Sequence, residues 1–251
     1  MFSPLWWRRR RAEPIDDQVW LRVCRRLSWR HGAAPDAGDR ARAERFLASH
    51  DIHAAQDMRL DDARRALIAT LCTRPLRHLD ERLLGRWRDL IVYPGQFRVR
   101  RTHADDDGLV REWDEELAGE AWEDGPIVLS WIDVLADLAD PQPGFDVVVH
   151  EIAHKLDLSD GAMNGTPALP DAAHRRRWID AFQAAFDDLN ARLDRGESPP
   201  IDDYAAEAEG EFFAVVSEYH FTAPDQLVSV YPDVAAALTA FYGPARATVK
   251  R

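Results

Sequence analysis

Two histidines and one glutamate are the residues of this chain best placed to do chemistry. His150 and His154 lie four residues apart, with Glu151 directly after the first of them. On a helix, side chains at this spacing share one face, so both imidazoles can bind the same zinc ion. Glu151 would then lie beside that ion, where it can accept a proton from a bound water. The pattern predicts metal-assisted hydrolysis; the alternative is a surface helix that carries two histidines without a metal.

A catalytic zinc needs a third protein ligand, with the fourth position left to water. Asp157 follows the histidines closely, but a metal midway between His150 and His154 would lie roughly 7–8 Å back along the helix axis. The short side chain of Asp157 should not reach that far. We expect it either to contact an imidazole from behind or to serve only at the end of the helix.

A later acidic segment is the better source of the third ligand. If residues 201–220 form one helix, a single face carries four polar side chains spaced by three, four and seven residues: Tyr204, Glu207, Glu211 and Glu218. His220 lies nine residues after Glu211, about 900° of helical turn, and therefore on the opposite side. Spacing alone leaves all three glutamates open, and an ordinary charged helix face remains the alternative.

The elements that must position these residues follow from the spacing of apolar side chains. Residues 17–88 show a helical pattern that is interrupted at Pro35 and Pro75. Short apolar runs then indicate strands at 90–93, 97–100, 109–113 and 125–131. Helical spacing returns at 145–156, 178–193, 201–220 and 234–242. Strands in the middle with helices at both ends predict an α+β fold.

The composition indicates in which compartment the protein works and whether it crosses a membrane. The chain has 251 residues, a formal net charge of −12 and two cysteines, Cys24 and Cys72, without a CxxC pair. Two isolated thiols fit a reducing cytoplasm, and no apolar run approaches the roughly 18–20 residues that cross a bilayer. We expect a cytoplasmic protein without a transmembrane segment. Residues 1–11, rich in Trp and Arg, are interpreted as a loose tail or as a weak membrane or acidic-partner contact.

An acidic block precedes the metal motif. Ten acidic residues and one arginine lie between Ala104 and Asp124. Such a charge repels phosphates, so we expect no nucleic acid as a partner of the main body. The block is either a solvated loop and strand face or a negative cleft wall that attracts a free amino terminus. The second interpretation predicts an aminopeptidase-like preference for short peptides.

Several motifs occur together in a specific order. They are Gly119-Glu-Ala-Trp122, Gly125-Pro-Ile-Val-Leu-Ser-Trp131, His150-Glu-Ile-Ala-His-Lys-Leu-Asp157, then Tyr204, Glu211-Phe-Phe-Ala-Val-Val-Ser-Glu-Tyr219 and Pro232. This combination resembles the family of Mlc titration factor A, a family of glucose-regulated zinc metallopeptidases. The similarity covers roughly residues 90–244, and the helical region before it matches less distinctively.

The resemblance implies a fold, a ligand set and an activity. The glutamate that opens the Glu-x-Phe-Ala run is a zinc ligand in that family, which selects Glu211 beside His150 and His154. The implied fold is a zincin-like core at 90–251, with a small mixed sheet, an HExxH helix and a third-ligand helix. A tail and helical extension at 1–89 would pack on that core in one compact unit.

The expected activity is zinc-dependent peptide hydrolysis with one Zn²⁺ per chain. Glu151 would act as the base, and Tyr204 either donates a hydrogen bond to the developing oxyanion or only packs. The run Gly125–Ser130 is either an edge strand that pairs with an extended peptide or a purely structural strand. The alternative function, which the resemblance also permits, is a regulatory protein that sequesters a transcriptional repressor.

Overall fold

The computed structural model describes residues 13–27, 35–85, 87–121 without 105–109, and 125–245. For residues 98–104 and 110–117 only the backbone is described. The Trp- and Arg-rich segment at 1–11 lies outside the described residues, as does much of the acidic block. None of the described helices combines the length and apolar character that a membrane span requires.

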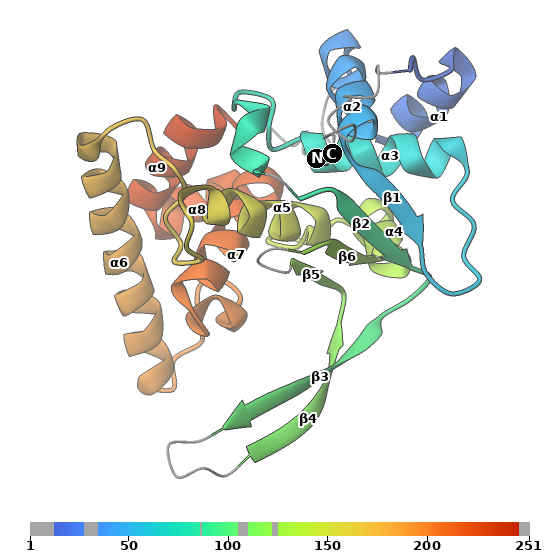
Figure 1. The fold of residues 1–251 in the computed structure, drawn as a ribbon. Coiled ribbons are helices and arrows are strands. Elements are labelled where there is room, and N and C mark those ends of the chain that lie inside the picture. Colours follow the sequence, from blue (N-terminus) through green and yellow to red (C-terminus); the bar gives the residue numbers. More distant parts are fainter. Residues whose placement is uncertain (1–12, 28–34, 86, 105–109, 122–124, 246–251) are drawn as a thin grey trace, which may run out of the picture.

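A small mixed sheet forms the centre of the fold (Figure 1). Its strand order is β1-β2-β6-β5, with bounds Asp51–Ala54, Asp89–Tyr93, Ile127–Ser130 and Gly119–Ala121. The first three strands are parallel to their neighbours, whereas β5 runs antiparallel to β6. All four residues of β6 are buried, because this strand has a neighbour on each side and helices cover the sheet.

The position of β6 corrects one sequence expectation. The run Gly125–Ser130 was a candidate for the edge strand that receives a peptide, but β6 lies inside the sheet between β2 and β5. The outer strand next to it is β5, whose residues are only partly buried. Four consecutive apolar or small buried residues are typical of such an inner strand, since both of its faces are covered.

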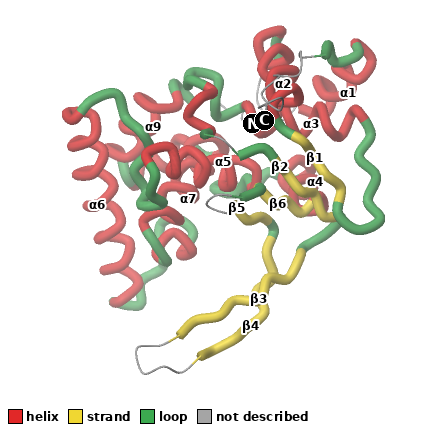
Figure 2. Tube along the Cα trace, in the orientation of Figure 1, coloured by secondary structure: helices red, strands yellow, loops and turns green. Residues whose placement is uncertain are grey.

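Helices pack against the sheet (Figure 2). Before the metal motif they are α1 (Asp17–Leu27), α2 (Ala37–Ser49), α3 (Asp62–Thr73), a 3-10 turn η2 (Glu81–Leu84) and α4 (Trp131–Ala139). From the motif onward they are α5 (Val147–Asp157), η3 (Leu158–Asp160), α6 (Ala172–Asp194), η4 (Asp203–Ala206), α7 (Glu209–Thr222), α8 (Pro224–Val230) and α9 (Pro232–Tyr242). The fold is therefore mixed α and β with a small sheet, as predicted.

A two-stranded hairpin projects from this body (Figure 1). Its strands, β3 (Phe97–Ala104) and β4 (Val110–Leu117), pair antiparallel from Phe97 opposite Leu117 to Ala104 opposite Val110. Both strands were predicted, but each extends several residues beyond the apolar run that indicated it. Backbone pairing between the two strands continues where the sequence has turned polar.

One hydrophobic core joins the N-terminal helices to the rest of the chain. Its buried residues run from Ile15 in front of α1 to Tyr242 at the end of α9. The strand β1, at 51–54, lies within the region where only helices were expected, and it pairs with β2. Only Ile52 of β1 is buried, so the strand has too little apolar alternation to be recognised. The division of the chain near residue 90 stays a prediction.

The expected single helix at 201–220 is wrong. The side chain of Asp202 accepts a hydrogen bond from the Tyr204 backbone N–H at 2.9 Å, which starts the short turn η4. Ala208 then adopts an extended conformation, with φ −160° and ψ 161°, and α7 begins after it. Tyr204 and Glu207 therefore do not share a helix with Glu211. The apolar residues keep a helix-like spacing across this break, because those before it and those after it pack into the same core.

Candidate metal centre

The helix α5 presents His150 and His154 on one face. Asp146 caps this helix by accepting the Val149 N–H at 3.1 Å, which fixes where the helix begins. The two imidazole rings lie with centroids 4.8 Å apart, and their Nε2 atoms are separated by 3.1 Å. Val148, Ile152 and Ala153 of the same helix are buried in the core. The predicted pair of histidines thus faces one point.

Glu211, in the first turn of α7, meets this pair from the opposite side. Its Oε2 lies 3.1 Å from Nε2 of His150 and 3.3 Å from Nε2 of His154. Each of the three residues therefore offers one ligand atom to a common cluster. The structure brings together His150 and His154, the two candidate ligands from the motif, and Glu211, the candidate that the family resemblance selected.

The donor atoms fit a divalent metal. Zinc bonds of about 2.0–2.1 Å in tetrahedral geometry place ligand atoms roughly 3.3 Å apart, close to the three separations found here. Nδ1 of His150 lies 2.8 Å from Oε1 of Glu218, and it donates to that oxygen when Glu218 is ionised. In the neutral imidazole, the form that binds a metal, Nε2 then presents a lone pair toward the cluster. Lone pairs and a carboxylate that converge in this way repel one another unless a cation lies between them.

Charge at the cluster favours such a cation. Burial alone would lower the pKa of His150, but the carboxylates of Glu211 and Glu218 hold it well above its usual value. Burial would likewise raise the pKa of Glu211, yet hydrogen bonds from His150 and His154 hold that pKa well below its usual value. The cluster therefore keeps its carboxylate ionised and attracts positive charge, as protons or as a metal ion.

Glu151 lies beside the cluster and is 3% exposed. Burial raises the pKa of this carboxyl to about 6, although the neighbouring His150 and His154 lower it. Its Oε2 has no hydrogen-bond partner among the described residues. A carboxyl with a pKa near neutrality and one free oxygen is suited to accept and return a proton at physiological pH.

Gly119 of β5 makes room for this carboxyl. A Cβ atom built on Gly119 would lie 2.3 Å from Oε1 of Glu151, far inside van der Waals contact. Gly119 opens the motif Gly119-Glu-Ala-Trp122, but the motif alone gives this glycine no role. A glycine in a strand often marks a close approach by another group, and that signal was available.

The other two candidate glutamates lie outside the ligand cluster. Glu218 stands behind His150: Oε1 accepts from the imidazole, and Oε2 accepts from the backbone N–H of Asp146. Burial raises the pKa of Glu218 to about 7 against the effect of His150. Glu207 is exposed at the end of η4. His220 is buried and stacked on Tyr242 with ring centroids 5.6 Å apart, away from the ligands as expected.

Tyr204 lies next to the cluster although it is not on α7. The turn η4 places its ring centroid 6.0 Å from that of His150, at an interplanar angle of 39°. Its side chain is partly open to solvent, with 37% of the residue exposed. The tyrosine is therefore near the candidate ligands and accessible, and its chemical role stays a prediction.

Asp157 ties the end of α5 to the following loop. Its Oδ2 accepts the Gly165 N–H at 2.8 Å, and burial raises the pKa of the carboxyl to about 6. Among the described residues, Oδ1 of Asp157 and Nδ1 of His154 have no hydrogen-bond partner. The sequence left open whether Asp157 contacts an imidazole or serves only at the end of the helix. Its hydrogen bond to Gly165 fits the second role, and Asp157 is not in the ligand cluster.

Comparison with known proteins decides the family. The chain matches the family described as glucose-regulated metallo-peptidase M90 over residues 4–243. This protein belongs to that family. A protein of Escherichia fergusonii named Mlc titration factor A is 36% identical over 206 residues, which cover 81% of this chain and 77% of that protein. The protein of the same name from Salmonella agona is 37% identical over 207 residues, covering 80% and 76%.

The M90 match confirms the resemblance inferred from the motifs and extends it to the N-terminal helices. The residues before 90 carried few distinctive motifs, yet the family match begins at residue 4. Membership identifies a metallopeptidase family, and the cluster of His150, His154 and Glu211 is compatible with the metal that such a family name implies.

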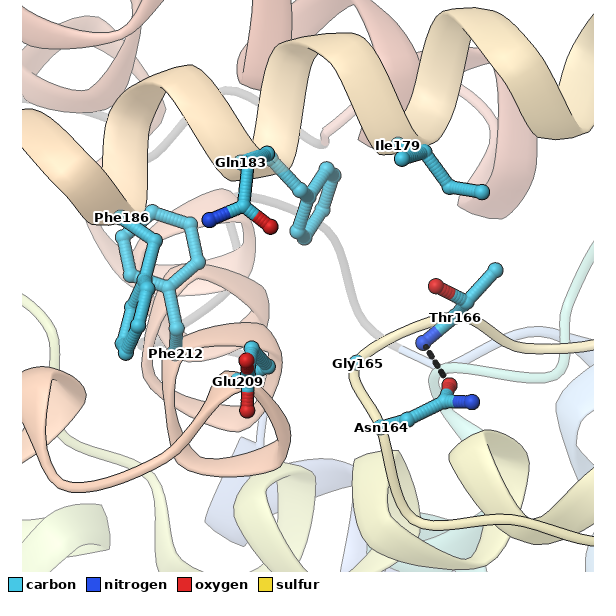
Figure 3. Close-up of a pocket in the computed structure, with 9 residues that line it drawn as sticks. Asn164, Gly165, Thr166, Ile179, Gln183, Phe186, Glu209 and Phe212 are labelled. Carbon is cyan, nitrogen blue, oxygen red and sulfur yellow. Dashed lines mark hydrogen bonds between the residues drawn. The ribbon is translucent and has the colours of Figure 1, made fainter.

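A small cavity lies near the start of α7 but apart from the ligands (Figure 3). Its volume is about 40 Å³, room for a few water molecules. It is lined by α6, by the loop after α5 and by α7: Asn164, Gly165, Thr166, Ile179, Phe182, Gln183, Phe186, Glu209 and Phe212. Figure 3 shows the Asn164 side chain turned back to accept the Thr166 N–H at 3.0 Å. None of the candidate ligands lines this cavity.

Proposed function

We propose that this protein is a cytoplasmic zinc-dependent peptidase with a zincin-like core. The observation that carries the proposal is the convergence of three donor atoms on one point with a buried carboxyl beside them. His150, His154 and Glu211 would hold one Zn²⁺. When bound, zinc lowers the pKa of a water toward neutrality and polarises a peptide carbonyl.

Glu151 would move the proton. Its free Oε2 accepts a proton from the attacking water and later delivers it to the nitrogen of the leaving amine. Gly119 leaves the carboxyl enough space to lie against β5, and burial there sets its pKa near neutrality. Tyr204 would donate its phenolic hydrogen to the oxygen that becomes negative as the carbonyl is attacked.

The substrate we propose is an extended peptide. Within the described residues β5 is the outermost strand on its side of the sheet, and it packs against α5. A peptide that added to this strand would lie alongside Glu151. Most of the acidic residues at 104–124 belong to segments whose side chains are not described. Their charge supports a preference for short peptides with a free amino terminus.

The first test combines metal content with hydrolysis. Purified protein should contain one zinc per chain and cleave short peptides, lose this activity with a chelator, and recover it with zinc. Glu151→Gln should keep the zinc but lose about 100- to 10,000-fold in hydrolysis, because the base is gone. Glu207→Gln, at an exposed glutamate outside the cluster, is the matched control. Full hydrolysis by Glu151→Gln would show that the base is wrongly assigned.

The substrate preference has a test of its own. Matched peptides with free and with acetylated amino termini should differ in kcat/KM, and the free form should be cleaved faster. Equal cleavage of both would reject the aminopeptidase-like preference without touching the assignment of the metal or the base.

The names of the relatives favour a second function. Both compared proteins are called Mlc titration factor A, and that name describes a factor that titrates Mlc. By analogy, this chain would bind and sequester a transcriptional repressor, with hydrolysis secondary. Capture of a purified repressor of this type by the Glu151→Gln variant would show binding that does not require catalysis. Failure to bind it would leave only the peptidase proposal.

A further inference from the structure

The two candidate histidine ligands are supported very differently. His150 is held from behind by Glu218, at 2.8 Å between Nδ1 and Oε1. Nδ1 of His154 has no hydrogen-bond partner among the described residues. A carboxylate behind a metal-bound imidazole fixes the orientation of the ring and raises its basicity. The position and charge of Glu218 therefore bear on how tightly a metal is held.

Glu218 is itself anchored to the start of α5. Its second oxygen accepts the backbone N–H of Asp146, the residue that caps α5. The same α7 residue thus contacts both the cap of the metal helix and its first histidine. Any movement of Glu218 along α7 would break both contacts together.

The chain of contacts continues into the N-terminal region. Oδ2 of Asp146 forms an ion pair with Nη2 of Arg74 at 3.0 Å. Arg74 ends α3, and its guanidinium lies 5.1 Å from the ring centre of Phe221 on α7. The side chain of Asp146 is 3% exposed and that of Arg74 is 18% exposed, so water screens this pair weakly.

The charges explain why a cation is needed there. The carboxyl groups of Asp146 and Glu218 are both buried, and Glu218 accepts the backbone N–H of Asp146. Two buried negative charges repel each other, and burial penalises each of them. The guanidinium of Arg74 pairs with Asp146 and so offsets the negative charge of the carboxyl next to Glu218.

We propose that Glu218, Asp146 and Arg74 form a positioning chain for His150, through which the N-terminal helices raise the affinity of the site for its metal. This role of the positioning chain depends on the metal centre of the proposed function but not on peptide hydrolysis. It gives the region before residue 90 a part in the site, although none of the candidate ligands belongs to it.

The test of the positioning chain is the zinc affinity of the full-length protein. Competition with a chromophoric chelator measures it. Glu218→Gln removes the negative charge behind His150. The imidazole and the backbone N–H of Asp146 both donate, but an amide has only one oxygen to accept, so its N–H₂ group must face one of these donors. This variant should weaken zinc binding about 10- to 100-fold. Arg74→Met, one contact further away, should weaken it about three- to tenfold, and Arg74→Lys should restore most of the loss. The melting temperature of the chelated protein is measured for each variant.

Arg77→Met is the matched control. Arg77 lies three residues after Arg74 and pairs with Asp36 and Asp39 rather than with Asp146. It should lower the melting temperature of the chelated protein without changing the zinc Kd. If Arg74→Met and Arg77→Met bind zinc equally well, or Arg74→Lys restores nothing, the positioning chain is wrong while the metal site stands. Wild-type protein that binds no zinc would overturn both.

Discussion

The two walls of the candidate site are built by different kinds of structure. One wall is the helix pair α5 and α7, whose ligands converge within 3.1–3.3 Å of one another. The other wall is the strand β5, which contributes Gly119, a residue without a side chain, against Glu151. The helical wall carries the candidate ligands, two on α5 and one on α7. The sheet wall contributes no side chain at Gly119 and leaves room for the carboxyl of Glu151.

The difference matters for what each wall can control. Changes in the helical wall should alter metal affinity and stability, because the helices carry the ligands and much of the core. Changes in the sheet wall should alter the position of Glu151 and leave the metal in place. Variants in the two walls should therefore have separable effects on metal affinity and on catalysis.

Gly165→Ala should disturb the helical wall most. Gly165 has φ +73°, and a Cβ there would lie 2.5 Å from the backbone oxygen of Glu209 at the start of α7. Its N–H also donates to Asp157 at the end of α5, so this loop contacts both helices and we expect it to set their spacing. We expect a loss of about 3 kcal/mol or more in unfolding free energy, measured with denaturant, and weaker zinc binding.

Gly196→Ala is the matched control for backbone strain. Gly196 has φ +70°, nearly the same as Gly165, but a Cβ there meets nothing within 4 Å. It should cost about 1–2 kcal/mol, the strain of the left-handed conformation alone. Equal losses for the two variants would show that contact with Glu209 contributes nothing and that the loop does not set the spacing of α5 and α7.

The sequence identified the helical wall far better than the sheet wall, for a physical reason. Helical periodicity at 150–154 places His150 and His154 on one face whatever packs around them, and the family motif adds Glu211. The role of Glu218 was not found, because i and i+7 positions share a face and spacing cannot say which side of an imidazole a glutamate will reach.

Elements that depend on tertiary partners were missed. The strand β1 buries only Ile52, and β5 is three residues long, so neither has a readable pattern of its own. The helix α4 begins directly at Trp131, where the apolar run of β6 continues without a visible stop. The sequence did not reveal the break at Ala208, because apolar residues before and after it pack into the same core and keep a helix-like spacing.

Gly119→Ala tests the sheet wall. The added methyl group must push the carboxyl of Glu151 away from β5, and a displacement of about 1 Å can lower the rate about 100-fold. We expect kcat/KM for peptide hydrolysis to fall by about that factor while the zinc Kd and the unfolding free energy change little. Steady-state kinetics and zinc competition on the same preparation measure both.

Gly95→Ala is the control for adding a methyl group elsewhere. The nearest atom to a Cβ on Gly95 is Cγ2 of Ile132, at an ordinary contact distance of 3.9 Å. This variant should keep wild-type kinetics. Loss of zinc in Gly119→Ala would contradict the separation of the walls, because the strand would then also support the ligands.

His50 lies outside the candidate site and is covered both by its own helix and by a residue from elsewhere in the chain. It should give the smallest of these effects, a change in stability with pH. It ends α2, where Phe46 of the same helix stacks on it at 4.1 Å between ring centroids. Trp87, from outside that helix, covers it at 4.4 Å. Burial lowers the pKa of His50 to about 4, even though the Phe46 carbonyl accepts a hydrogen bond from the ring and raises it.

The sign of the pH effect follows from this lowered pKa. Between about pH 6.5 and pH 4 the unfolded chain protonates His50 and the folded chain does not, so stability falls as the pH falls through that window. Allowing for partial exposure, His50 should contribute about 2 kcal/mol to this fall. Denaturant unfolding of the wild type and of His50→Gln at pH 7 and pH 4.5 measures the contribution, since glutamine does not titrate. If the two proteins lose the same stability between these pH values, contacts from Phe46 and Trp87 do not keep the folded imidazole neutral.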